Sequence, residues 1–268
     1  MLPASTYHAS DGAAYEVFLG RWSRELAPRL LDFAGFAEDG PLIDIGTGTG
    51  SLANAMAARW PRRAIVGLDV AAPYIAYAKG RSAGTEPTFA VGDATALAYG
   101  DGVFAGAAAQ LVLNFIPNAL AAVCEMRRVT SPGGTIVAAV WDFRGGLVYQ
   151  RLFWDTAAGV DAAAADARDR LFSGALALPD GLLALFGKVG LRRIERGSLT
   201  IRMNYANFGD YWGPLLGGQG PVGSYLASRD HALRRRLEEA VRRAYCSGLP
   251  DGERSLTATA WAVRGTVP

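Results

Sequence analysis

The pattern with the clearest chemical meaning in this sequence is a short apolar run that ends in three closely spaced glycines. Glycines in such a turn let the backbone adopt positive φ values and let a ligand approach without a Cβ in the way. We therefore expect a buried strand that opens into a ligand-binding turn and then a helix. The residues of this turn are Asp44, Gly46, Thr47, Gly48 and Gly50, with the glycines in the spacing G-x-G-x-G.

That spacing distinguishes the turn from other nucleotide-binding loops. The dinucleotide fingerprint G-x-G-x-x-G requires a glycine at the position of Ser51, and the third glycine comes one residue early. A phosphate-binding P-loop is excluded because the sequence has no G-x-x-x-x-G-K-[ST] pattern. A short-chain dehydrogenase is disfavoured because no Tyr-x-x-x-Lys pair accompanies the turn.

Two further aspartates close later apolar runs. Asp69 ends the second run, 19 residues after Gly50, where a carboxylate can accept both hydroxyls of a ribose. Asp93 ends the third run, where a carboxylate can accept from the exocyclic amine of adenine. Because parallel strands bring their carboxyl ends to one edge of a sheet, one adenosine-shaped ligand would satisfy these two acids and Asp44 together.

These residues give the chain a resemblance to the class I S-adenosylmethionine-dependent methyltransferases, in particular the bacterial small-molecule, type 11-like group. Asp44 and the three glycines match the family's first motif, Asp69 its ribose acid and Asp93 its adenine acid. The resemblance implies S-adenosyl-L-methionine as the cofactor, which suits the acids because it carries a sulfonium cation and no pyrophosphate. The resemblance covers residues 15–142 with specific motifs and continues more loosely to the C-terminal strand.

The resemblance also implies a wider cofactor site. Gln110, at the end of the fourth apolar run, is expected near the methyl-donating sulfur, and Arg21 could pair with the cofactor carboxylate or lie on the surface beside Trp22. Asp44 could contact the methionine amine directly or act only through the loop. No catalytic residue is assigned and no metal site is expected. The full predicted set is Asp44, Gly46, Thr47, Gly48, Gly50, Asp69, Val70, Asp93, Ala94, Gln110 and Arg21.

Alternating apolar runs and helical periodicity predict the elements that position these residues. This βαβ repetition predicts an α/β, doubly wound, Rossmann-like sheet with right-handed crossovers. The family resemblance implies about seven strands in the order 3-2-1-4-5-7-6, mostly parallel with an antiparallel last strand, and helical insertions that form a lid. Strands are expected at residues 42–45, 64–68, 88–91, 103–111 and 135–141, and helices at 51–59, 72–80 and 118–129.

The rest of the chain is interpreted as additions to this core within one domain, residues 1–268. Residues 1–40 are expected to form an N-terminal helical flap, with apolar side chains at helical spacing over 13–33. The remaining predicted parts are a cofactor-binding core at 41–142, substrate-side insertions at 143–190 and 206–254, and closing strands at 191–205 and 255–268.

Aromatic side chains are concentrated after the fifth and sixth predicted strands. In the family that the chain resembles, these segments form the acceptor pocket. We expect most of these side chains in the core and three or four in the pocket. They are Trp141, Phe143, Tyr149, Phe153, Trp154, Tyr205, Phe208, Tyr211, Trp212 and Tyr225.

The amino-acid composition limits the classes of partner that this protein could bind. The 27 Lys and Arg against 25 Asp and Glu leave a net charge of +2. Because nucleic-acid-binding domains are usually strongly basic, this charge argues against a nucleic-acid partner. The two cysteines and two histidines form no zinc-ligand pattern. No apolar run approaches the ~20 residues that cross a bilayer. We expect a cytoplasmic, bacterial protein that acts on a small-molecule acceptor, and the question of a homodimer is left open.

The predicted activity is transfer of the sulfonium methyl to an O, N or C nucleophile of a small organic acceptor by in-line displacement. Alignment and an apolar, water-poor pocket would supply most of the rate, so a general base could be dispensable. The alternative is a non-catalytic cofactor-binding subunit or sensor on the same fold, because a fold does not fix a function.

Overall fold

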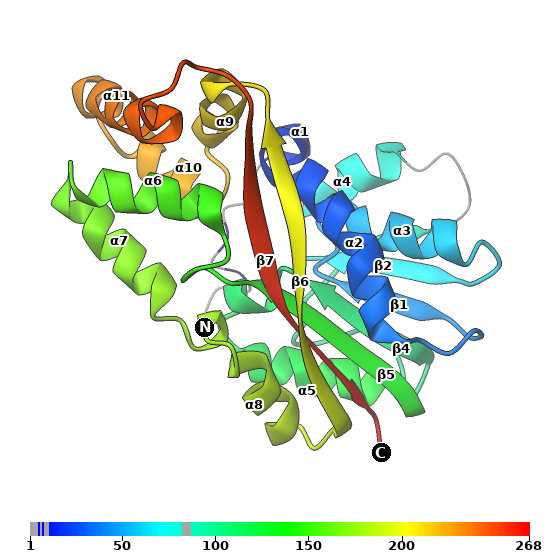
Figure 1. Cartoon of the computed structure of the whole chain (residues 1–268). Helices are drawn as coiled ribbons and strands as arrows, with labels where there is room; N and C mark the ends of the chain where they lie inside the picture. Colours follow the sequence, from blue (N-terminus) through cyan, green and yellow to red (C-terminus); the bar gives the residue numbers. More distant parts are fainter. Residues whose placement is uncertain (1–4, 6, 8–10, 82–86) are drawn as a thin grey trace.

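A seven-stranded sheet forms the centre of the molecule in the computed structural model, which describes residues 5, 7, 11–81 and 87–268 (Figure 1). The strand order is β3-β2-β1-β4-β5-β7-β6, and only β7 runs antiparallel to its neighbours among these strands. The predicted order and the antiparallel last strand are both confirmed. The strands are β1 Leu42–Ile45, β2 Ile65–Asp69, β3 Thr88–Val91, β4 Phe104–Gln110, β5 Thr130–Trp141, β6 Arg192–Tyr205 and β7 Arg254–Thr266.

Helices cover both faces of the sheet, which explains why the central strands are apolar without alternation. Successive side chains of β1 point to opposite faces, so Leu42 joins one apolar core while Ile43 and Ile45 join the other. The first core contains α2 Arg21–Ala34, α3 Ser51–Arg59 and α4 Ala72–Arg81, and the second contains α5 Ala119–Val129 and α8 Gly181–Lys188.

A second group of helices lies at the end of the sheet where β5 and β6 finish (Figure 1). Because these are the carboxyl ends of the parallel strands, this group covers the edge at which open α/β sheets bind ligands. Its aromatic side chains belong to the same apolar core as α2 and α3. The helices are α6 Val148–Ala158, α7 Ala162–Phe172, α9 Phe208–Trp212, α10 Gly220–Ala227 and α11 His231–Cys246.

The N-terminal helix departs from the expected continuous segment. It divides into α1 Gly12–Tyr15, a π-helical turn at Glu16–Gly20, and α2. Strand β5 also begins five residues earlier than expected, because Thr130 pairs with Phe104 ahead of a register shift and the Ser131 hydroxyl donates to the carbonyl of Gly102 at 2.6 Å. The division into flap, core and insertions stays a prediction.

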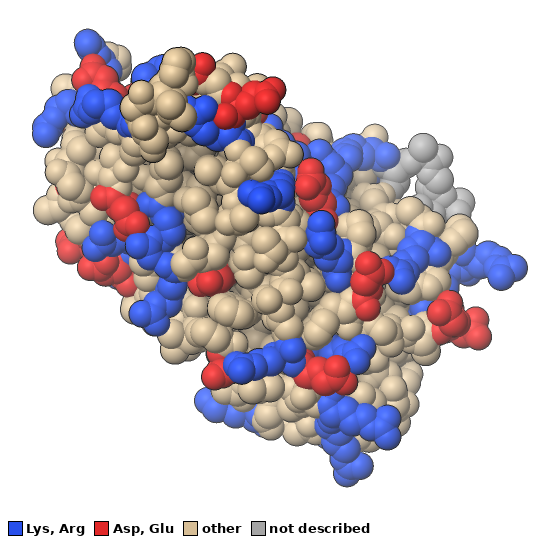
Figure 2. Space-filling view, in the orientation of Figure 1, with Lys and Arg blue, Asp and Glu red and all other residues tan. Residues whose placement is uncertain are grey.

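Charged side chains of both signs are interspersed on the face drawn in Figure 2. Among the described residues, none of the helices has the length and apolar character needed to cross a bilayer. Within the same residues, no three His, Cys, Asp or Glu side chains are grouped closely enough to hold a metal ion.

Candidate active site

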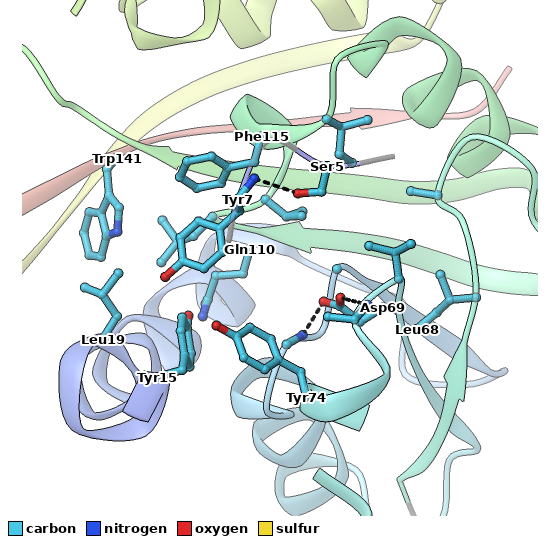
Figure 3. A pocket seen from close by; sticks show the side chains of 18 of the residues that line it. Ser5, Tyr7, Tyr15, Leu19, Leu68, Asp69, Tyr74, Gln110, Phe115 and Trp141 are labelled. Atoms are coloured by element: carbon cyan, nitrogen blue, oxygen red, sulfur yellow. Dashed lines mark hydrogen bonds between the residues drawn. The ribbon is translucent and has the colours of Figure 1, made fainter. Parts of the chain in front are cut away.

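The predicted residues meet at a cavity of about 360 Å³ at the carboxyl ends of β1, β2, β3 and β4 (Figure 3). The glycine turn and the residues after β2 and β3 form one side, and the N-terminal helices form another. Seven members of the predicted set line this cavity, whereas Asp44, Thr47, Gly50 and Arg21 do not. The seven are Gly46, Gly48, Asp69, Val70, Asp93, Ala94 and Gln110.

The glycine turn needs glycine for two different reasons. At Gly46, φ is +67° and an added Cβ would lie 2.3 Å from a methyl of Val112, so the close approach of the β4 segment forbids a side chain. At Gly48, φ is +56°, and the nearest neighbour of an added Cβ is Tyr74 at 3.9 Å. Gly48 therefore presents open backbone to the cavity.

Asp69 fixes the turn to the end of β2. Its Oδ2 accepts from the Gly48 amide and its Oδ1 from the Ala71 amide, each at 2.8 Å. Burial raises the pKa of Asp69, although these backbone hydrogen bonds act in the opposite direction. A carboxylate has about four lone-pair sites, so both oxygens keep capacity to accept from a ligand.

Asp93 follows β3 on the same cavity wall. Its Oδ1 accepts from the amide and the hydroxyl of Thr95, both at 2.8 Å, which holds the carboxylate in one orientation. No donor from the described residues hydrogen-bonds to its Oδ2. Asp93 thus offers a preoriented acceptor to a ligand amine.

Asp44 lies beneath the turn, with a side chain that is fully buried. Its Oδ2 accepts from the Thr47 hydroxyl at 2.6 Å and from the Ala53 amide in the first turn of α3 at 3.1 Å. Its Oδ1 is buried without a hydrogen-bond partner among the described residues. Burial raises the pKa of Asp44 to about 7, against the lowering effect of the Thr47 and Ala53 hydrogen bonds. This placement favours the indirect alternative, in which Asp44 acts through the loop.

Gln110, at the end of β4, presents a fixed amide oxygen. Its Nε2 donates to the Ser23 carbonyl at 3.0 Å, and because a carbonyl can only accept, the amide cannot be flipped. The Oε1 is buried and lacks a hydrogen-bond partner among the described residues, as does the indole Nε1 of Trp141, another residue of the cavity lining. The next residue, Leu111, has φ 64°, a conformation that costs a non-glycine residue about 1–3 kcal/mol and clusters at functional sites.

Three tyrosines that the sequence analysis did not assign to the site cover the cavity. Figure 3 shows the hydroxyls of Tyr7, Tyr15 and Tyr74 directed toward the region of Gln110. The Tyr15 ring lies 6.4 Å from that of Tyr7 and 5.1 Å from that of Tyr74, and the Tyr74 hydroxyl donates to the Gln219 Oε1 at 2.9 Å. Burial raises the pKa of Tyr15 to about 12 and raises those of Tyr7 and Tyr74 as well. These hydroxyls are therefore neutral at physiological pH.

A family model described as a methyltransferase domain matches residues 43–138, the segment that holds the glycine turn, both cavity aspartates and Gln110. Residues 43–138 thus form a methyltransferase domain of the class I, S-adenosylmethionine-dependent kind. The resemblance drawn from the turn and the two spaced acids is thereby confirmed.

Relatives of this methyltransferase domain act on different acceptors, as their names state. The chain is similar to a demethylmenaquinone methyltransferase of Thermus thermophilus, at 35% identity over 119 residues, 44% of this chain and 52% of the relative. It is also similar to a malonyl-[acyl-carrier protein] O-methyltransferase of Xylella fastidiosa, at 30% identity over 112 residues, 41% and 38% of the two chains. These matches therefore span about half or less of each relative.

Solved structures share the fold over nearly the whole chain. Phosphoethanolamine N-methyltransferase 2 of Haemonchus contortus, solved with phosphomonomethylethanolamine and S-adenosylhomocysteine, aligns with a TM-score of 0.58 at 15% identity. That alignment covers 96% of this chain and 57% of the other. The YcgJ protein of Bacillus subtilis aligns with a TM-score of 0.52 at 16% identity, covering 92% and 98%. At these identities the likeness shows the fold alone.

Arg21, the first residue of α2, does not line the cavity. Its Nη1 donates to Asp210 at 2.9 Å, and its guanidinium carbon lies 4.3 Å from the Trp22 ring centroid and 5.2 Å from that of Tyr205. In this structure Arg21 links α2 to α9. The expected pairing with the cofactor carboxylate has no geometric support here, and a partly surface-exposed arginine beside a core tryptophan is what the structure shows.

The ten aromatic residues that follow the fifth and sixth predicted strands are mostly core, as expected, and all ten are buried. Only Trp141 and Phe143 among them line the cavity, rather than three or four. The N-terminal helices and the segment after β4 supply other aromatic lining instead, including Phe18 and Phe115. The apolar spacing of the N-terminal helix signalled Phe18, whereas no pattern singled out Tyr7.

Proposed function

We propose that this protein transfers a methyl group from S-adenosyl-L-methionine to an uncharged nucleophile on a small organic acceptor. The observation that carries the proposal is the meeting of Asp69, Asp93 and the Gln110–Trp141 end in one cavity. The two acids suit the adenosine half of the cofactor, and the other end provides the room in which an acceptor can meet the methyl group.

The residues present fit this cofactor. In the proposed arrangement Asp69 accepts from the ribose hydroxyls, the free Oδ2 of Asp93 accepts from the adenine amine, and the open backbone at Gly48 faces the methionine part. When bound, S-adenosylmethionine supplies an electrophilic methyl group on a sulfonium. Gln110 lies on the cavity wall, and its amide oxygen, which has no hydrogen-bond partner among the described residues, is available to orient the ligand there.

The chain's own contribution is alignment and the exclusion of water. The ionisable side chains of the described lining are Asp69, Asp93, Tyr7, Tyr15 and Tyr74. The acids lie at the proposed adenosine end, and the tyrosines stay protonated because burial raises their pKa. No described side chain at the acceptor end is therefore charged, which favours a neutral acceptor whose nucleophile needs little assistance from a base.

Calorimetry and turnover together test this proposal. Titration of the protein with S-adenosylmethionine should give a saturable heat, and incubation with panels of phenols, amines and quinols should release S-adenosylhomocysteine. Absence of binding at millimolar cofactor would refute the proposal. Binding without turnover on any neutral acceptor would instead support the alternative of a cofactor-binding subunit or sensor.

A further inference from the structure

A second cavity of about 780 Å³ adjoins the first. The two share part of their walls, namely Phe115, Ile116, Phe143 and Pro221. The Phe115 and Phe143 rings lie 6.5 Å apart in an edge-on arrangement at this boundary. The two cavities are therefore neighbours on either side of these shared residues.

The second cavity is lined mainly by apolar side chains, and Asn114 is an uncharged polar residue of the lining. The cavity lies between the segment after β4, the end of α7 and helix α8, and the charged residues of its lining are all exposed at its rim. These are Arg170, Asp180 and Lys188, and Asp180 is paired with Arg196 outside the cavity. The apolar lining side chains are Leu113, Phe115, Ile116, Phe143, Leu171, Leu176, Leu178 and Leu185, with several alanines.

The sizes of the two cavities define what each can hold. Small-molecule sites span about 300–1,000 Å³, so the first cavity, at about 360 Å³, is at the small end for one ligand. If it holds both the cofactor and the methylated group, little of it remains for the rest of an acceptor. The larger adjoining cavity offers that room, and only apolar groups would gain by leaving water for it.

We propose that the acceptor is amphipathic, with a compact neutral head methylated in the first cavity and an apolar tail lying in the second. This inference rests on the proposed function and names the substrate class for the same site. The tail runs beside the Phe115–Phe143 pair, because rings 6.5 Å apart leave no room between them, and it ends toward the charged residues Arg170 and Lys188. We assign the tail to the second cavity because the two cavities share wall residues, and not only because the second cavity is lined by apolar side chains.

A binding series on the complex with S-adenosylhomocysteine tests the tail directly. The probes are 4-ethylphenol, 4-butylphenol and 4-hexylphenol, which share one neutral head and differ only in tail length. Affinity measured by calorimetry should rise by about tenfold or more from the ethyl to the hexyl compound, since each buried methylene favours binding. Equal affinities across the series, or no binding by any member, would overturn the proposal.

Two variants test whether the tail lies in the second cavity. Ala184 on α8 is exposed and lines this cavity, so Ala184→Trp should fill it and reduce the gain with tail length to about twofold or less. Leu178→Asp, at a side chain that is 40% exposed, should do the same by placing a charge on the apolar wall. Ala162→Trp, at an exposed position that lines neither cavity, is the matched control and should keep the full gain.

Titration with S-adenosylhomocysteine separates the two possible failures. Unchanged affinity of the variants for it shows that they are folded and that the first cavity is intact. Failure of the wild type to bind it removes the proposed function itself. Binding of S-adenosylhomocysteine together with tail-independent phenol affinity, or a full gain retained in both Ala184→Trp and Leu178→Asp, removes the amphipathic acceptor alone.

Discussion

Asp69 has the most constrained role of the residues in the site. Its carboxylate already accepts from Gly48 and Ala71, so the glycine turn and the proposed ribose contact depend on the same two oxygens. Replacing Asp69 by asparagine should weaken ligand binding more than it weakens the fold. The single oxygen of the asparagine amide can still accept from one of the two backbone amides, but the negative charge and the second acceptor oxygen are lost.

We expect Asp69→Asn to weaken S-adenosylmethionine binding by about 10-fold to 100-fold, the range for losing a hydrogen bond to a charged group. Calorimetric titration measures this. Asp166→Asn, at an exposed position on α7, is the control and should bind like the wild type. Wild-type affinity in Asp69→Asn would show that the ribose lies elsewhere.

Asp44 links the site to the pH dependence of stability. Its pKa is raised by burial from 3.8 to about 7, so between these values the unfolded chain releases a proton that the folded chain retains. The contribution of Asp44 to the free energy of unfolding is therefore fully present below pH about 4 and is lost as the pH rises toward about 7.

We predict that Asp44→Asn removes this dependence, because an amide cannot titrate. Urea unfolding of both proteins across this pH range should show the wild type losing stability relative to Asp44→Asn as the pH rises. Titratable groups remote from Asp44 are common to both proteins and cancel in the comparison, whereas Asp69 interacts electrostatically with Asp44 and contributes to the difference. Parallel stability curves would contradict the raised pKa.

At the scale of elements, the glycine turn holds β1, β2 and the segment after β4 in register. The Gly46 amide donates to the Leu68 carbonyl at 2.7 Å while its α-carbon lies against Val112. Neither a shift of the turn nor a shift of Val112 can be made without moving the cavity wall, since both Gly46 and Val112 line it.

Gly46→Ala should therefore destabilise the protein by more than about 1 kcal/mol and abolish cofactor binding, because it adds a clash to an unfavourable φ. Gly187→Ala in α8 is the matched control: an added Cβ there meets no atom within 4 Å, and alanine should stabilise this helix slightly. Urea unfolding compares the two variants. Equal stabilities would contradict the close approach.

The link between α2 and α9 gives a prediction about Arg21. Both partners of the Arg21–Asp210 pair are about 30% exposed, so the pair stabilises the fold weakly. Arg21→Met should lower the free energy of unfolding by about 1 kcal/mol or less and leave the affinity for S-adenosylmethionine within about twofold of wild type. A tenfold loss of affinity would restore the cofactor role that the sequence suggested.

For the whole molecule, the sequence predicted what local pattern and known topology determine. The first five strands follow from the apolar runs, the three acids from motif spacing, and the strand order from the family resemblance. Three features could not be predicted this way. The partner of Arg21 is Asp210, 189 residues away along the chain. The three tyrosines over the first cavity, Tyr7, Tyr15 and Tyr74, come from segments far apart in the sequence. The second cavity forms where α7 and α8 pack beside the segment after β4.

Long-range packing also builds much of the wall at the proposed acceptor end of the cavity. Residues 43–138 match the family model, whereas much of the acceptor-side covering lies outside them, in Tyr7, Tyr15, Trp141, Phe143 and α10. The residues proposed to hold the adenosine part of the cofactor thus lie within the matched segment, whereas much of the proposed acceptor end lies outside it.

The most direct test of the central claim is a crystal structure of the protein with S-adenosylhomocysteine. Our account predicts the ribose hydroxyls on Asp69, the adenine amine at Asp93 Oδ2, and the sulfur on the side of the cavity where Gln110 and Trp141 lie. A ligand bound outside this cavity, or with its adenine at the Gln110 end, would contradict it.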